Sequence, residues 1–154
     1  MGDALPRLLV GGNDDVSYKI KSQLLMAPGF GFAKNLLVDQ HFSQRGRMAR
    51  LIGAVAQNPR VLGIGIDENT AIIVGPGARR FTVMGEGAAY VVDGGKSTYS
   101  NIGEEDPDRT LSAFDVMIHM LSQGDTFDLA RRRPRSNRAE TLDVGEDEGE
   151  EESD

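Results

Sequence analysis

A strand–helix–strand pattern between residues 36 and 66 constrains the fold of this chain more than any other feature. Leu36-Leu37-Val38 is a continuous apolar run, typical of a short strand buried on both faces of a parallel sheet, and a second such run lies at residues 61–66. Between them, an apolar stripe with helical spacing is formed by Met48, Leu51, Ile52 and Val55. Asn58-Pro59 then ends the helix. The pattern predicts a right-handed βαβ unit whose helix covers the sheet.

After residue 69 the pattern changes to short β-rich runs separated by glycine-rich turns. These runs lie at residues 70–74, 80–84, 88–92 and 97–100. We expect them to form an antiparallel meander appended to the parallel unit, followed by a strand at 116–121 and a closing segment at 125–129. Ahead of the unit, residues 27–32 combine Pro with Gly and predict a loop. The fold class is therefore α/β.

The composition excludes several classes of function. The chain has no cysteine, which excludes disulfides, cysteine nucleophiles and thiolate metal sites. A net charge of −7 argues against a nucleic-acid partner, and no apolar run reaches the ~18 residues of a membrane-spanning helix. No secretory signal pattern is present, so we expect a cytoplasmic protein. We expect no metal, because the spacing of Asp39, His41, Asp67 and Glu68 matches no metal-binding motif. We expect no dinucleotide cofactor, because Glu68 stands where a fingerprint beginning at Gly63 would need its third glycine, and no helix is predicted after it.

The charges at the end of the chain are grouped by sign. The run Arg131-Arg132-Arg133-Pro134-Arg135 is basic, whereas residues 146–154 are almost entirely acid and glycine. Such a segment has too little apolar surface to offset the entropy cost of ordering, so we predict that residues 131–154 are disordered and that residues 1–130 form the domain. The functional alternative is a tail that neutralises itself or binds another protein.

Polar, ionisable side chains follow both strands of the predicted βαβ unit. Asp39, Gln40 and His41 come after the first strand, and Asp67 and Glu68 come after the second. Open α/β sheets place ligands at the carboxyl ends of their strands, so we expect a histidine and a carboxylate to meet at this edge. A histidine oriented by a carboxylate is the general-base half of a nucleophilic triad. The alternative is a structural histidine in a loop.

Three arginines, Arg45, Arg47 and Arg50, stand at the start of the predicted helix. The positive end of the helix dipole disfavours cations there, so the arginines require an anionic partner. Guanidinium groups bind carboxylates in a bidentate manner, which favours a pocket for an anionic substrate. The alternative is an ordinary solvated helix face.

A resemblance to the cyanophycinase family covers residues 26–129. It is carried by Asp39-Gln40-His41-Phe42-Ser43-Gln44-Arg45-Gly46-Arg47-Met48-Ala49-Arg50-Leu51, by Ala54-Val55-Ala56-Gln57-Asn58-Pro59 and by Leu62-Gly63-Ile64-Gly65-Ile66-Asp67-Glu68-Asn69-Thr70-Ala71. Pro107-Asp108-Arg109 and Leu121-Ser122-Gln123-Gly124-Asp125 resemble the carboxyl-terminal region of the family. The family consists of serine-type exopeptidases related to α-aspartyl dipeptidase.

The resemblance implies a fold, a substrate and residue roles. The fold is the carboxyl-terminal part of a three-layer class I glutamine amidotransferase-like (flavodoxin-like) fold, in a protein that is usually a homodimer. The substrate is cyanophycin, a polyaspartate with arginine on its side chains, which is cut to β-Asp-Arg dipeptides. His41 resembles the triad histidine and Glu68 the triad acid. The residues that resemble the substrate pocket are Asp39, Gln40, Arg45, Arg47 and Arg50.

The sequence departs from the family at the nucleophile. The family's serine lies on a Gly-x-Ser-x-Gly strand–turn–helix elbow upstream of the histidine, and this sequence contains no such motif. We therefore expect the chain to correspond to the carboxyl-terminal half of the family and to be inactive alone. Activity requires a partner chain that supplies the amino-terminal half with the serine. The alternatives are a pseudoenzyme that binds cyanophycin or another β-aspartyl peptide without cutting it, and an inert truncated remnant.

Overall fold

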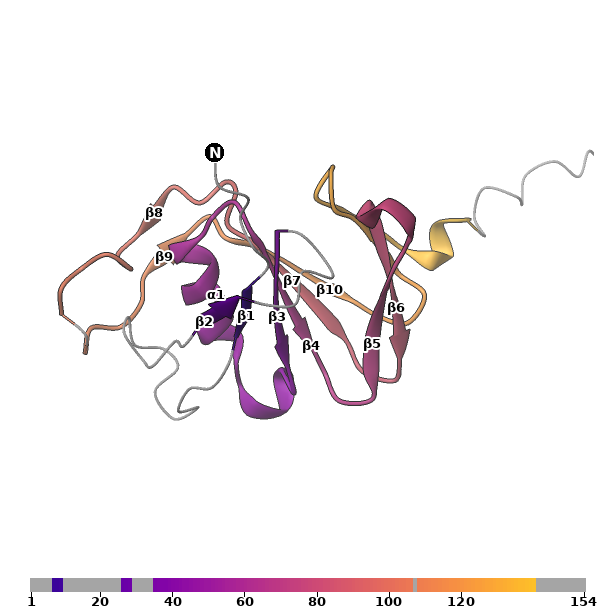
Figure 1. The fold of residues 1–154 in the computed structure, drawn as a ribbon, viewed down its shortest axis with the longest axis horizontal. Helices are drawn as coiled ribbons and strands as arrows, with labels where there is room; N and C mark the ends of the chain where they lie inside the picture. The colour runs from indigo at the N-terminus through magenta and orange to yellow at the C-terminus, as the bar shows by residue number, and fades with distance from the viewer. Residues whose placement is uncertain (1–6, 10–25, 29–34, 107, 141–154) are drawn as a thin grey trace, which may run out of the picture.

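The computed structural model describes residues 7–9, 26–28, 35–106 and 108–140. Figure 1 shows the helix α1 (Met48–Gln57) and the strands to which it is joined. The strands form a six-stranded, a four-stranded and a two-stranded sheet. No helix in these ranges is long and apolar enough to cross a membrane.

The six-stranded sheet has the order β10-β7-β4-β3-β1-β2. Its strands are β1 (Arg7–Leu9), β2 (Met26–Pro28), β3 (Leu36–Gln40), β4 (Leu62–Ile66), β7 (Ala89–Asp93) and β10 (Met117–Leu121). Strands β1, β3 and β4 are mutually parallel, whereas β2, β7 and β10 each pair antiparallel to a neighbour. In β3 and β4, Leu36 lies opposite Leu62 and Gln40 opposite Ile66. The predicted unit of β3, α1 and β4 is confirmed.

The four-stranded sheet has the order β12-β11-β6-β5, and β8 pairs with β9 in the small sheet. The bounds are β5 (Thr70–Val74), β6 (Arg80–Gly85), β8 (Tyr99–Ser100), β9 (Ala113–Phe114), β11 (Thr126–Asp128) and β12 (Arg133–Arg135). Single turns of 3-10 helix are η2 (Ser43–Arg45), η3 (Pro76–Ala78) and η4 (Asn137–Glu140). The predicted runs at 70–74, 80–84 and 88–92 are therefore strands.

The predicted meander is wrong in its topology. Strands β5 and β6 form a hairpin, but β7 pairs with β4 and β10 in the larger sheet instead of with β6. The physical reason is burial, because β7 buries Val91 and Val92 on opposite faces, as an inner strand must. Strand β5 alternates between exposed and half-buried residues, as a strand covered on one face does.

Two further expectations require correction. Pro28 belongs to β2, which pairs only with β1 among the described strands, and such an edge tolerates a proline. The basic run predicted to be disordered from residue 131 contains β12, which pairs with β11. Arg132 orders this run by bonding to Asp93 and by donating from Nη2 to the carbonyl oxygen of Arg60 at 2.7 Å. Residues 141–154 lie outside the described residues.

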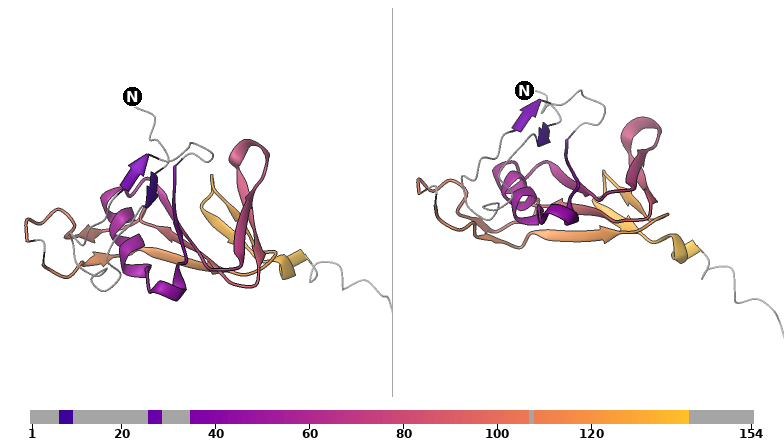
Figure 2. Two further views of the ribbon diagram at one scale, coloured as in Figure 1. Left: turned by 60° about the horizontal axis from the view of Figure 1, so that its bottom comes forward. Right: turned by 90° about the horizontal axis from the view of Figure 1, so that it is seen from below.

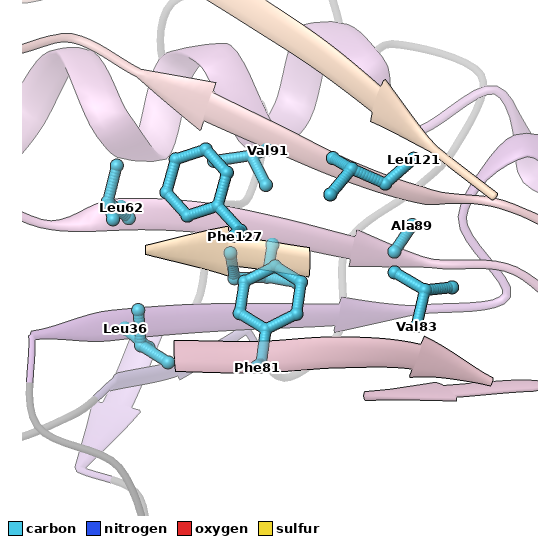
Figure 3. Close-up of a cluster of buried hydrophobic side chains, with 9 residues drawn as sticks. Leu36, Leu62, Phe81, Val83, Ala89, Val91, Leu121 and Phe127 are labelled. Carbon is cyan, nitrogen blue, oxygen red and sulfur yellow. The ribbon is translucent and has the colours of Figure 1, made fainter. Parts of the chain in front are cut away.

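The larger sheet is covered on both faces. One face packs against the four-stranded sheet, where the rings of Phe81 and Phe127 stack with centroids 5.6 Å apart among buried aliphatic side chains (Figure 3). The other face packs against Leu51 and Val55 of α1. Figure 2 shows α1 and the β5–β6 hairpin on opposite sides of the larger sheet from two further directions. The layers are therefore helix, sheet and sheet.

Two glycines of β4 allow this close packing. A Cβ atom on Gly63 would lie 2.8 Å from Val55 of α1, and a Cβ atom on Gly65 would lie 2.4 Å from the ring of Phe42. Both distances are too short for carbon atoms, so only glycine lets the helix and the ring lie directly on the strand. Gly63 and Gly65, which interrupt the apolar side chains of β4, therefore have a packing role.

We expect Gly65→Ala to destabilise the chain by about 1–3 kcal/mol, because the buried Phe42 ring must move away from the added methyl group. Gly53→Ala is the matched control: its Cβ would meet Leu111 at an ordinary 3.5 Å, within α1. Replacing a helical glycine with alanine stabilises by roughly 0.5–1 kcal/mol. Urea denaturation measures both changes, and equal midpoints for the two variants would contradict the packing argument.

Candidate functional site

His41 and Glu68 meet at the carboxyl ends of β3 and β4. The Nδ1 atom of His41 lies 3.0 Å from Oε1 of Glu68, and the two side chains are 52% and 54% exposed. A carboxylate only accepts hydrogen bonds, so Nδ1 carries the proton and the Nε2 lone pair of the neutral imidazole is left for another proton. The two residues thus adopt the arrangement of a general base oriented by an acid.

A buried neighbour holds His41 in place. His41 has a φ of 50°, so the chain turns sharply as it leaves β3. The next residue, Phe42, is 1% exposed, and its N–H donates to the carbonyl oxygen of Ile66 at 3.2 Å. The Phe42 ring lies 5.2 Å from that of Tyr90 between centroids. This anchor under the sheet edge fixes the backbone from which the imidazole projects into solvent.

Asp67 and Glu68 have different surroundings although they are adjacent. Asp67 is 8% exposed, and its Oδ1 accepts the N–H of Ser43 at 2.8 Å. The N–H of Glu68 donates to Oε1 of Gln44 at 3.4 Å. Asp67 thus ties the turn after β4 to the turn after β3, and Glu68 is left to face His41. Sequence reasoning had not assigned a role to Gln44 or Ser43, and only the folded turns reveal one.

Asp39 and Arg50 form a buried ion pair. Arg50 Nε donates to Asp39 Oδ2 at 3.0 Å and Nη2 donates to Oδ1 at 2.5 Å, with exposures of 3% and 2% for the two residues. Arg47 Nη1 reaches the same carboxylate at 3.4 Å and the carbonyl oxygen of Gln40 at 2.5 Å. The anionic partner expected for Arg47 and Arg50 is therefore Asp39, a residue of the chain itself.

The remaining predicted pocket residues are exposed. Arg45 ends the η2 turn, and Gln40 ends β3 beside His41. A cavity of about 410 Å³ lies at this edge and is lined by Gln40, His41 and residues 66–72. Of the seven predicted site residues, Gln40, His41 and Glu68 line the cavity, and the Asp39–Arg50 pair is buried behind them. The lining residues Asn69 and Thr70 carried no sequence signal for a site.

The chain was compared with known proteins. No protein-family model matches it. It is 38% identical over 120 residues to the cyanophycinase of Synechococcus elongatus, a match of 77% of this chain and 36% of that protein. It is 34% identical over 127 residues to the cyanophycinase of Geminocystis herdmanii, covering 82% of this chain and 46% of that protein. It is 36% identical over 124 residues to the cyanophycinase of Trichormus variabilis, a match that covers 80% of this chain and 41% of that protein.

The chain spans less than half the length of each of these curated relatives. The matches cover about four fifths of the chain itself at more than one third identity. The resemblance carried by the residues around His41 and Glu68 is thereby confirmed. The chain is related to the cyanophycinases and corresponds to a part of their length.

Proposed function

We propose that this chain carries the histidine, the acid and part of the substrate pocket of a cyanophycinase-like serine peptidase. The observation that supports it best is the contact of 3.0 Å between His41 and Glu68 beside a cavity, in a chain related to the cyanophycinases. The substrate is cyanophycin or another β-aspartyl peptide. The α/β unit corresponds, in this proposal, to the carboxyl-terminal part of a class I glutamine amidotransferase-like fold, comprising residues 1–130.

His41 moves the proton in the proposed reaction. A serine hydroxyl attacks the carbonyl carbon of a backbone peptide bond between two aspartates, and the Nε2 atom of His41 takes the hydroxyl proton and returns it to the leaving amine. The β-linkage between aspartate and arginine stays intact in the β-Asp-Arg product. Water then attacks the acyl-enzyme with His41 again acting as base. Glu68 holds Nδ1–H and stabilises the imidazolium as it forms. Both side chains are half exposed, and a segment that covers them would strengthen their interaction by excluding water.

The pocket residues divide into two groups in this proposal. Gln40 lines the cavity, and Arg45 is exposed in the η2 turn that follows His41, so we assign these two to contacts with the substrate. Asp39 and Arg50 are buried against each other, so we assign them to positioning the end of β3 against α1. Arg47 bridges the groups because it binds both the Asp39 carboxylate and the Gln40 backbone. A second copy of the chain is a further proposed partner, as in the homodimers of the family.

The nucleophile is contributed by a segment outside this sequence, because the sequence contains no Gly-x-Ser-x-Gly elbow. Co-expression of this chain with the part of the Geminocystis herdmanii cyanophycinase outside the match tests this. We expect the co-purified pair to release β-Asp-Arg from cyanophycin and either component alone to release none. A folded, co-purified complex without hydrolysis would overturn the peptidase proposal.

The missing elbow also favours a second candidate, a pseudoenzyme that binds cyanophycin without cutting it. Its test is co-sedimentation of the chain with cyanophycin granules, with Arg45→Ala as the variant because this arginine is exposed in the η2 turn after His41. Binding that depends on Arg45, in a complex without hydrolysis, favours the pseudoenzyme. Absence of both binding and a cooperative unfolding transition favours an inert remnant.

A further inference from the structure

A second and larger cavity lies at the other end of α1 from His41. Its volume is about 550 Å³, within the range of roughly 300–1,000 Å³ that is common for ligand pockets. Its walls are the turn at Pro59 and Arg60 after α1, the end of β7, the start of β10 and residues 131–134. None of its lining residues belongs to the cavity at His41. The proposed peptidase chemistry makes no use of it.

Cationic side chains dominate this cavity, which we call the basic cavity. Five of its lining residues are cationic, namely Arg60, Lys96, Arg131, Arg132 and Arg133. Asp93 is its one lining carboxylate, and this group is engaged by Arg132 and by the N–H of Gly95 at 2.8 Å. Arg131 pairs at 3.1 Å with Asp128, outside the lining. Within the described part of the chain, the other three cations have no carboxylate partner.

His119 adds an unmet hydrogen-bonding group to the wall of the basic cavity. It lines the cavity, and its Nε2 atom is buried without a hydrogen-bond partner among the described residues. Buried polar atoms are normally paired, because leaving one unpaired costs about 1–3 kcal/mol. Both the excess of positive charge and the unpaired nitrogen therefore call for a polar, anionic occupant with several charges.

We propose that the acidic run at residues 146–154 of this same chain docks in the basic cavity. Seven of these nine residues are Asp or Glu, so the run supplies the clustered carboxylates that the cavity lacks. Guanidinium groups pair with carboxylates more strongly than neutral donors do. Docking places a fixed negative segment over a positive wall, and it excludes other polyanions from that wall.

The acidic run follows the wall of the basic cavity closely in the sequence. Lining residue Pro134 precedes the run by twelve positions, and five residues separate η4 from it. Those five residues span up to about 20 Å when fully extended. Two segments that a short linker joins meet at an effective concentration of the order of millimolar. Individually weak, solvent-screened ion pairs suffice for docking at such a concentration.

The first test compares peptide binding to two full-length chains. One is unchanged, and in the other, the neutral-tail variant, every Glu and Asp of residues 146–154 is replaced by Gln or Asn. A fluorescent peptide of residues 141–154 is titrated into each and followed by fluorescence anisotropy. We expect at least tenfold tighter binding to the neutral-tail variant, because the unchanged tail competes for the cavity. Equal affinity for the two chains overturns the proposal.

Charge reversal locates the binding site of the peptide. In the neutral-tail background, Lys96→Glu is expected to weaken peptide binding at least tenfold. Arg109→Glu is the matched control, because it makes the same charge change at an exposed side chain outside the basic cavity, and we expect less than a twofold effect. Equal effects of the two substitutions overturn the proposal. Binding of inorganic phosphate, but not of the peptide, to the neutral-tail variant also overturns it.

Zero-length cross-linking tests the contact within the unchanged chain. A carbodiimide joins a lysine amine to a carboxylate that touches it, and mass spectrometry identifies the pair. We expect residues 146–154 to be joined to Lys96 in preference to Lys19, Lys21 and Lys34, and the product to disappear in 0.5 M NaCl as salt screens the contact. Cross-links distributed equally over the four lysines overturn the docking proposal. This result is independent of whether the chain takes part in a peptidase.

Discussion

His41→Asn lowers the kcat of the reconstituted peptidase by roughly 10⁶-fold, the loss that removal of the triad histidine causes in subtilisin. The Nε2 atom that takes the serine proton in the proposed reaction is gone in this variant, and the amide that replaces it is not basic. Asparagine is the correct replacement because position 41 has a φ of 50°, a region that asparagine tolerates better than alanine does. The measurement is the rate of β-Asp-Arg release by the co-purified pair.

Glu68→Gln is expected to lower kcat less than His41→Asn does. The amide has the same size as the Glu68 side chain but carries no negative charge. It therefore no longer fixes the tautomer of His41 through a hydrogen bond to a carboxylate, and it no longer stabilises the imidazolium. A loss of about 10⁴-fold in kcat is expected, as in the equivalent change in a serine protease. KM stays within a few-fold in both variants, because neither side chain is assigned to substrate binding. A reconstituted pair that keeps more than a tenth of its kcat with Asn at position 41 would show that His41 is not the base.

Asp39→Asn destabilises the chain by about 3–5 kcal/mol, the cost of breaking a buried ion pair by neutralising one partner. Arg50 is 3% exposed and loses the carboxylate that binds its Nε and Nη2 atoms, while Arg47 loses the same partner. The guanidinium of Arg50 is then left buried beside a neutral amide. Urea denaturation followed by far-ultraviolet circular dichroism measures the loss.

Two controls make the Asp39 prediction specific. Glu104→Gln breaks an ion pair of 2.6 Å with Arg109, whose side chain is 57% exposed, and it is expected to cost less than about 1 kcal/mol. The double variant Asp39→Leu with Arg50→Met replaces both charges with apolar groups, and it is expected to recover much of the loss because the buried guanidinium of Arg50 is removed together with its carboxylate. Equal midpoints for Asp39→Asn and Glu104→Gln would contradict the assignment of the Asp39–Arg50 pair to the framework of the site.

The sequence predicted that the arginines at the helix start need an anionic partner, but it did not identify that partner. The sequence placed Arg45, Arg47 and Arg50 together at a helix start and required an anion for them. It did not indicate that Asp39, eleven residues before Arg50, is that anion. Which arginine points inward depends on how α1 packs on the sheet, and that packing is set by Gly63 and the helix residues above it.

The βαβ unit and the edge that carries the site could be predicted from local patterns. Each element of the unit has a pattern of apolar residues that can be recognised within a short stretch of sequence. These patterns are the apolar run at residues 36–38, the helical stripe from Met48 and the apolar run at residues 61–66. Parallel pairing of β3 and β4 then places the segments after both strands at the same edge, whatever the rest of the chain does. For this reason the local patterns predicted that a histidine and a carboxylate meet at this edge, as His41 and Glu68 do.

Long-range pairing decided the rest. Local patterns in the sequence could not show that β7 joins β4, that β12 orders a basic run, or that Glu68 instead of Asp67 faces His41. The choice of Glu68 had come from the family resemblance alone. Each of these depends on a partner far away in the chain: Ile66 opposite Ala89, Arg132 against Asp93, and Ser43 donating to Asp67. Local pattern records which side chains must be buried, whereas only the assembled sheets determine against which neighbour each of them is buried.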